Sequence, residues 1–132
     1  MRLLILLFIG LFWVSCQPTE QEQQGEPAQE QPFIIDIDIE QFSELSKESN
    51  TVILDVRTPQ EIAQGKIDGA IEIDFLAPDF AKAIRQLDKK KAYLVYCRSG
   101  NRSTQACQVM EEEGFGKLYN MLGGYNAWST RH

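Results

Sequence analysis

The chain has 132 residues, a formal net charge of -6 and 43% hydrophobic residues, which fits one globular domain with room for an appendage. The acidic balance argues against general nucleic-acid binding, because that needs a basic face. There are three cysteines, no CxxC pair and one histidine, His132, which argues against a zinc site and against a Cys–His catalytic pair. We therefore expect no metal and no cofactor.

The N-terminus resembles a bacterial lipoprotein signal. The run 3–14 is apolar apart from one glycine; it is too short to cross a bilayer of roughly 30 Å as a helix but is typical of a signal-peptide core. Ser15 precedes Cys16, as in lipoprotein signals, whereas Trp13 stands where an aliphatic residue is usual. We expect a signal peptide at 1–16 and lipidation of Cys16. Ordinary secretory cleavage, an uncleaved anchor and a core helix are the alternatives.

This signal predicts an exported protein, lipid-anchored to a membrane on its periplasmic or outer-surface side. Residues 17–32 are almost entirely Gln, Glu, Pro, Gly, Thr and Ala. Such a segment cannot bury enough apolar surface to become ordered, so we predict a disordered tether, with a root-mean-square span on the order of 20 Å. The globular domain is expected to occupy 33–132.

Within 33–132, predicted strands and helices alternate. The clearest strand is 51–57, whose apolar residues do not alternate with polar ones, as is typical of a strand covered on both faces in a parallel sheet. The pattern predicts an α/β domain with a parallel central sheet flanked by helices on both faces. The other predicted strands are 33–37 (an edge), 70–73, 92–96 and 117–121. The predicted helices are one that begins at 39 and ends near 49–50, then 59–63, 78–87, one following 97–103, and one following 122–124.

The stretch 97–103, Cys-Arg-Ser-Gly-Asn-Arg-Ser, lies between a predicted buried strand and a predicted helix. A loop in this position directs backbone N–H groups inward and points the positive end of the helix dipole at the cysteine. With two arginines in the same loop, the sequence predicts a cradle that holds an anion on or beside the thiolate of Cys97.

Four segments, 55–61, 65–71, 97–103 and 122–128, resemble the signature segments of the rhodanese family in the family's order and spacing. The resemblance covers 33–132. Lys66 departs from it, because the family commonly has His there. The resemblance implies a rhodanese-like α/β fold and a thiosulfate sulfurtransferase in which Cys97 is catalytic and carries sulfane sulfur as a persulfide. The sulfur would come from thiosulfate or a similar donor and pass to a thiol or cyanide. We expect a monomer.

Without a histidine base, Cys97 must be activated electrostatically, by the helix dipole and by hydrogen bonds from the loop. Arg98 and Arg102 are expected to neutralise the donor, although Arg102 could instead form a salt bridge that braces the loop. Gly100 permits the loop conformation. Ser99, Asn101 and Ser103 can donate side-chain hydrogen bonds, or Ser103 can cap the helix.

A charge network of Asp55, Arg57 and Glu61 is expected to brace the carboxyl end of the strand 51–57 and so position the loop. Cys107 is expected to pack in the core, with a role as resolving thiol for Cys97 as the alternative.

Three other functions fit parts of this pattern: a persulfide carrier, a rhodanese-fold binding module without catalysis, and a cysteine phosphatase. Protein tyrosine phosphatases have a Cys-x5-Arg loop, whereas Arg102 follows Cys97 after one residue fewer. The smaller ring suits a sulfur atom better than a tetrahedral phosphoryl group.

Overall fold

The computed structural model describes residues 33–132. The predicted signal peptide 1–16 with Cys16 and the predicted tether 17–32 lie outside the described residues. The elements are β1 (Phe33–Ile37), α1 (Ile39–Leu45), β2 (Thr51–Asp55), α2 (Pro59–Ile62), β3 (Ile71–Glu72), α3 (Phe80–Ile84), β4 (Ala92–Tyr96), α4 (Asn101–Glu112), β5 (Lys117–Met121) and α5 (Gly124–Trp128). None of the helices in 33–132 is long and apolar enough to cross a membrane.

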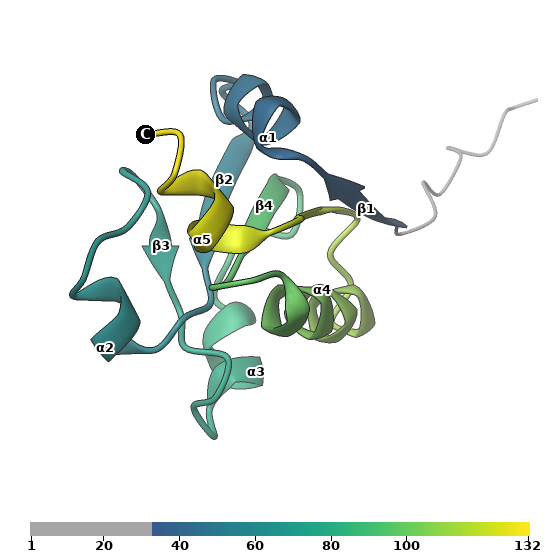
Figure 1. Cartoon of the computed structure of the whole chain (residues 1–132). Helices are drawn as coiled ribbons and strands as arrows, with labels where there is room; N and C mark the ends of the chain where they lie inside the picture. The colour runs from purple at the N-terminus through teal and green to yellow at the C-terminus, as the bar shows by residue number, and fades with distance from the viewer. Residues whose placement is uncertain (1–32) are drawn as a thin grey trace, which may run out of the picture.

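The five strands form one parallel sheet in the order β1-β5-β4-β2-β3. Helices α1 and α5 cover one face, and α3 and α4 cover the other, as Figure 1 shows with α1 above the sheet and α3 and α4 below it. The predicted α/β class, the parallel sheet with helices on both faces and the edge position of β1 are confirmed.

Strand β4 lies at the centre of the sheet, and all of its residues are buried. Its side chains alternate between two apolar clusters: Tyr93 and Val95 pack with α3 and α4, whereas Leu94 and Tyr96 pack with α1 and α5. Because both faces are covered, the strand reads as a continuous apolar run. At roughly 25 cal/mol per Å² of buried apolar surface, these clusters are the main source of stability of the fold.

Two elements near the carboxyl edge of the sheet differ from their predicted bounds. The strand predicted at 51–57 ends at Asp55 because the amide of Arg57 donates to the Asp55 carboxylate, 3.0 Å away, and no longer to a neighbouring strand. Helix α4 begins earlier than expected, at Asn101, because Gly100 with φ of 107° turns the chain directly into the helix. The adjacent carboxyl ends of β2 and β4 thus place Asp55 and Cys97 at the same edge.

Candidate active site

Cys97 lies directly after β4, with 1% of its surface exposed. Its sulfur is 3.1 Å from the amide nitrogen of Gly100 and 3.5 Å from the hydroxyl oxygen of Ser103. Of the two expectations for Ser103, the alternative of a helix cap is wrong: Gly100 is the N-cap, and Ser103 is a buried residue in the first turn of α4. In that position its hydroxyl oxygen lies near the sulfur and makes no side-chain cap hydrogen bond to the helix end.

Burial raises the pKa of the Cys97 thiol, because an apolar environment disfavours the thiolate. Hydrogen bonds from the hydroxyl and amide of Ser103 act in the opposite direction, as do those from the amides of Gly100 and Ser99. The hydrogen bonds outweigh the burial, so the pKa of Cys97 lies below its ordinary value. The thiol is activated without an imidazole.

The N-terminus of α5 holds the loop 97–103 in place through two backbone hydrogen bonds. The amide of Tyr125 donates to the carbonyl of Cys97 at 2.8 Å, and the amide of Asn126 donates to the carbonyl of Arg98 at 3.0 Å. Gly124 permits this approach: a Cβ there would lie 2.5 Å from the Cys97 carbonyl oxygen, and its φ is +55°. The segment 122–128, whose sequence is a family signature, therefore acts as the support for the loop.

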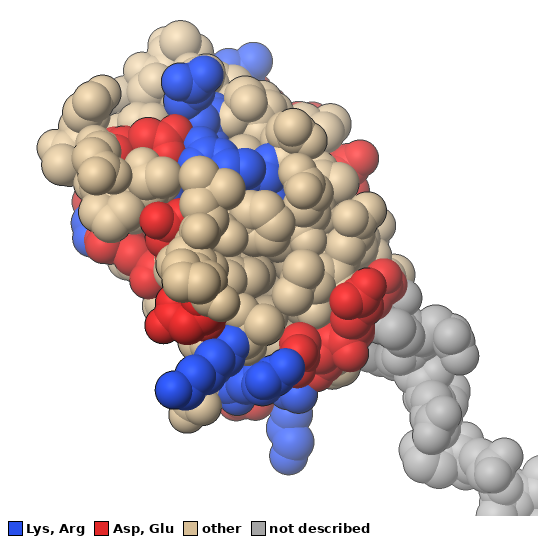
Figure 2. All heavy atoms as spheres, turned by 90° about the horizontal axis from the view of Figure 1, so that it is seen from below, with Lys and Arg blue, Asp and Glu red and all other residues tan. Residues whose placement is uncertain are grey.

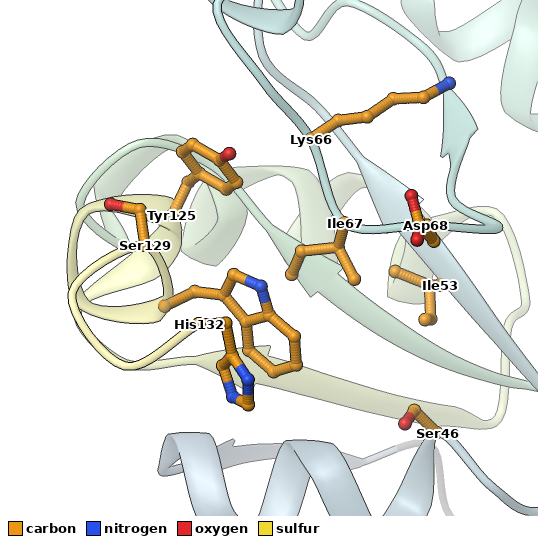
Figure 3. Close-up of a pocket in the computed structure, with 9 residues that line it drawn as sticks. Ser46, Ile53, Lys66, Ile67, Asp68, Tyr125, Ser129 and His132 are labelled. Carbon is orange, nitrogen blue, oxygen red and sulfur yellow. The ribbon is translucent and has the colours of Figure 1, made fainter.

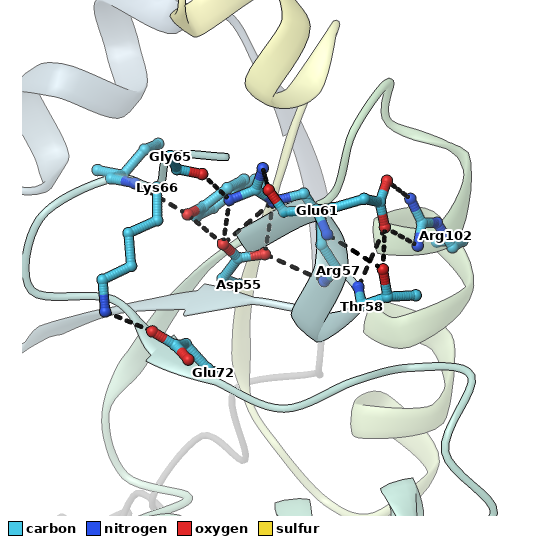
Figure 4. A network of polar contacts seen from close by, with 10 residues as sticks. Asp55, Arg57, Thr58, Glu61, Gly65, Lys66, Glu72 and Arg102 are labelled. Carbon is cyan, nitrogen blue, oxygen red and sulfur yellow. Dashed lines mark hydrogen bonds and ion pairs between the residues drawn. The ribbon is translucent and has the colours of Figure 1, made fainter. Parts of the chain in front are cut away.

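A buried ion pair joins Asp55 and Arg57 at the carboxyl end of β2 (Figure 4), with Asp55 Oδ2 and Arg57 Nη2 2.7 Å apart. The Tyr96 hydroxyl donates to the same Asp55 oxygen at 2.5 Å and accepts from the amide of Ile67. Burial, and then the bond to Asp55, raise the pKa of Tyr96, so it stays a donor. The Arg57 guanidinium also lies over the ring of Tyr125. One buried network thus ties β2, β4 and α5 together beneath the loop.

A second ion pair joins α2 to the loop helix. Arg102 contacts both carboxylate oxygens of Glu61, at 2.8 and 2.6 Å (Figure 4), while Glu61 also accepts from the amide and hydroxyl of Thr58 at 3.0 Å. The bond to Arg102 is the main reason that the pKa of Glu61 falls to about 2. Of the two expectations for Arg102, the geometry shows the brace: its guanidinium is already held by a carboxylate.

Arg98 is the exposed arginine of the loop, and within 33–132 it has no ion-pair partner. It lines a polar cavity of about 420 Å³ between α2 and α5, together with Arg57, Glu61, Gln64, Tyr125, Asn126 and Ser129. Ser99 and Asn101 are also exposed, on the outer side of the loop. Of the predicted site residues, Gly100 and Ser103 therefore lie beside the sulfur of Cys97, whereas Arg98 is free to meet an anion.

A larger cavity, of about 590 Å³, lies between α5 and the segment that joins α2 to β3 (Figure 3), and none of the residues 97–103 lines it. Lys66, the departure from the family pattern, lines this cavity and forms an ion pair with Glu72. Lys66 is exposed, in the segment between α2 and β3. Figure 2 shows Lys and Arg side chains at two ends of the lower face, each with acidic side chains beside them.

Cys107 is fully buried in the apolar cluster under α4. Burial raises the pKa of its thiol to about 12, so it is unreactive as a nucleophile at neutral pH. The prediction that it packs in the core is confirmed. Within 33–132, no group of three or more His, Cys, Asp or Glu side chains is arranged to hold a metal ion.

A family model described as the rhodanese-like domain matches residues 38–131. The chain belongs to this family. A sulfurtransferase from Allochromatium vinosum is 39% identical to it over 103 residues, which are 76% of this chain and 92% of that protein. The thiosulfate sulfurtransferase GlpE of Pseudomonas putida is 37% identical over 93 residues, covering 70% of this chain and 83% of the relative.

Among solved structures, a rhodanese-related protein from Thermoplasma volcanium superposes with a TM-score of 0.65 at 28% identity, covering 74% of this chain and 92% of that one. The rhodanese-like fold expected from the sequence is confirmed. Both of these curated relatives are named sulfurtransferases, which supports sulfur transfer at the level of the family.

Two residues of the site were not anticipated. In the sequence, Tyr96 looks like another apolar residue of a buried strand, and its hydroxyl is the one feature that indicates a polar role. Asn120 is a polar residue between Tyr119 and Met121 in the strand Lys117–Met121, and this polar interruption is the available signal. Both are buried and hydrogen-bonded, as buried polar groups must be.

Proposed function

We propose that this protein is a sulfurtransferase that carries sulfane sulfur as a persulfide on Cys97, taking it from thiosulfate and passing it to a thiol or to cyanide. The observation that carries the proposal is the sulfur of Cys97 beneath the loop amides, with the Gly100 nitrogen 3.1 Å away and the pKa of the thiol lowered. The names of the relatives support sulfur transfer as the reaction class.

In the first step, the Cys97 thiolate attacks the outer sulfur of thiosulfate. A bond forms between the two sulfur atoms, the sulfur–sulfur bond of thiosulfate breaks, and sulfite leaves with the electron pair. The new terminal sulfur carries the negative charge, which the inward N–H donors of the loop stabilise. Since Cys97 is 1% exposed, a small donor reaches the sulfur more readily than a bulky one.

In the second step, the acceptor attacks the terminal sulfur, and the electron pair of the broken bond returns to Cys97 as a thiolate. A thiolate acceptor becomes a persulfide, and cyanide becomes thiocyanate. Arg98, exposed at the mouth of the loop, would attract the thiosulfate dianion and the charged acceptor. Kinetics should follow a double-displacement pattern, because the same cysteine serves both half-reactions.

The test is the intact mass of the full chain after incubation with thiosulfate. The wild type and the control Cys107→Ala should each gain the mass of one sulfur atom, and Cys97→Ser should gain none. Subsequent cyanide should remove the added mass with release of thiocyanate. Equal mass gain in Cys97→Ser would refute the proposal. A mass gain that neither cyanide nor thiols remove would also contradict it.

The same preparations separate this function from the alternatives. A persulfide carrier would gain the sulfur but deliver it only to a protein thiol, whereas a binding module would gain none. Hydrolysis of p-nitrophenyl phosphate that depends on Cys97 would instead favour a phosphatase. The ion pair between Arg102 and Glu61 argues against a phosphatase, because phosphoryl transfer to a cysteine needs a free arginine over the phosphoryl group.

We also propose that the protein is exported and anchored to a membrane through Cys16. The support is the sequence of residues 1–16, with the apolar run and Ser15 before Cys16. Cells that express the wild type should incorporate a palmitate analogue into the protein and hold it in the membrane fraction. Cys16→Ser should lose both properties. Label or membrane retention equal to that of the wild type in this variant would refute the anchor.

A further inference from the structure

Asn120 of β5 is a buried polar side chain, 1% exposed, that the sulfur-transfer steps above do not use. Its Oδ1 lies 2.6 Å from Ser103 Oγ. Its Nδ2 lies 2.8 Å from Asp36 Oδ1 and 3.1 Å from Thr104 Oγ1. One amide therefore connects the edge strand β1 to the first turn of the loop helix, next to the reactive sulfur.

The direction of these hydrogen bonds follows from the partners. A carboxylate can only accept, so the amide nitrogen of Asn120 must face Asp36, and the amide oxygen is left facing Ser103. An amide oxygen can also only accept. The hydroxyl of Ser103 therefore donates its single proton to Asn120 in the contact of 2.6 Å.

The same proton is needed at the sulfur. Ser103 Oγ is 3.5 Å from Cys97 Sγ and 3.0 Å from the carbonyl of Gly100. That carbonyl already accepts from both the amide and the hydroxyl of Thr104. Two acceptors thus compete for one proton: the oxygen of Asn120 and the sulfur of Cys97.

We infer that Asn120, held in orientation by Asp36, is a positioning residue that controls the reactivity of Cys97 by competing with its sulfur for the proton of Ser103. The inference rests on the proposed role of Cys97 as the reacting thiol. While the thiol is neutral, Ser103 donates to Asn120. When the sulfur becomes anionic, the hydroxyl turns toward it, and the buried oxygen of Asn120 loses that donor.

The network has two effects on the site. It holds the Ser103 oxygen beside the sulfur, and it makes the anion harder to form than the loop donors alone would. The other charged and titratable groups around Cys97 are Arg98, the next residue of the loop, and Arg102 and Cys107 on α4. Glu61, Asp74 and Glu111 lie beside the α4 residues, and Asp36 lies on β1. The effect of Asp36 as a charge must therefore be separated from its effect through Asn120.

A double-mutant cycle makes this separation. In Asp36→Asn, the new side chain can offer either an oxygen or a nitrogen, so the amide of Asn120 is free to reverse and donate to Ser103. The proton of Ser103 then goes to the sulfur. We expect the pKa of Cys97 to fall by about one unit, with roughly tenfold faster alkylation at a pH well below it. In a Ser103→Ala background, Asp36→Asn should have only the smaller effect of removing a charge.

The measurement is the pH dependence of iodoacetamide alkylation in the full chain, followed by mass spectrometry on the peptide that contains Cys97. Equal changes of pKa in both backgrounds would show that Asp36 acts by charge alone, which overturns the inference. No change in either background also overturns it. Asn120→Ala is the second variant: it removes the competing acceptor and should lower the pKa in the Ser103 background only.

This experiment measures the pKa of the Cys97 thiol and does not measure sulfur transfer. If the cycle gives the expected coupling but thiosulfate adds no sulfur to Cys97, the proposed function fails and the network remains. If sulfur is added but no coupling appears, only the role of Asn120 fails.

Discussion

The ion pair between Glu61 and Arg102 makes a stability prediction that can be tested against pH. Arg102, and to a lesser extent Thr58, hold the pKa of Glu61 at about 2 instead of 4.5. A carboxylate with a lowered pKa stabilises the folded state above its unfolded pKa and loses that contribution as the pH falls through its folded pKa. Glu61 should therefore stabilise the protein above pH 4.5, and its contribution should disappear between there and about pH 2.

The difference between a pKa of 4.5 and a pKa of about 2 sets a ceiling of about 3–4 kcal/mol, at about 1.4 kcal/mol for each pKa unit. The side chains of Arg102 and Glu61 are 20% and 23% exposed, so solvent screens part of the interaction. We therefore expect the real contribution to be about 1–2 kcal/mol. Glu61→Gln imitates the protonated acid in shape and in hydrogen bonding, which makes it the appropriate substitution.

Urea unfolding followed by circular dichroism, at pH 7 and in steps down to pH 2, measures the effect. Glu61→Gln should be less stable than the wild type by about 1–2 kcal/mol at pH 7, and the two proteins should converge at the acid end. Glu112→Gln, at an exposed position of α4, controls for the change of one net charge. Equal stability of Glu61→Gln and the wild type at pH 7, or a difference that persists unchanged at pH 2, would refute this account of the ion pair.

Three further predictions concern the loop and its support. Arg98→Ala should raise KM for thiosulfate about tenfold with little change in kcat, because a charge-assisted contact is lost. The control Lys90→Ala, on a remote basic turn, should change neither KM nor kcat. An unchanged KM in Arg98→Ala would contradict the role assigned to Arg98. Cys107, whose pKa is raised to about 12, should remain unlabelled by iodoacetamide at neutral pH until the protein unfolds, and peptide mapping that finds it labelled in the folded protein would disprove this. Gly124→Ala should destabilise the protein by about 1–3 kcal/mol in urea unfolding and slow sulfur transfer, since its φ is +55° and the new Cβ would meet the carbonyl of the reactive cysteine. Gly116→Ala, which meets nothing within 4 Å, is the matched control, and equal stability of the two variants would refute the packing argument.

Most of the fold is predictable from local sequence. The strand Ala92–Tyr96 is predicted with its observed bounds, because an unbroken run of apolar and aromatic residues between a basic turn and a glycine-containing loop leaves few alternatives. The short elements were less well defined. The helix predicted at 78–87 spans only Phe80–Ile84, because apolar spacing extends into the turns on either side and does not distinguish a helix from the 3₁₀-like turns that follow it.

The arrangement of hydrogen-bond donors around the sulfur is predictable because it depends on consecutive residues. The loop 97–103 directs its own amides inward, so the position of Cys97 relative to Gly100 is a property of one short segment. The contacts made by the arginine side chains were not predictable in the same way. The partner of Arg102 is Glu61, 41 positions earlier in the chain, and only the pairing of β2 beside β4 brings the two together.

Because Arg102 has an ion-pair partner and Arg98 does not, the two arginines of the loop have different roles. Arg102 is committed to a carboxylate and stiffens the loop, so it can assist an anionic substrate only after giving up an interaction of about 1–2 kcal/mol. Arg98 gives up no ion pair within the described part of the chain. A rigid loop with one uncommitted cation suits the proposed reaction, in which the negative charge moves from donor to persulfide to acceptor, because the N–H donors remain in place while only the substrate's charge changes position.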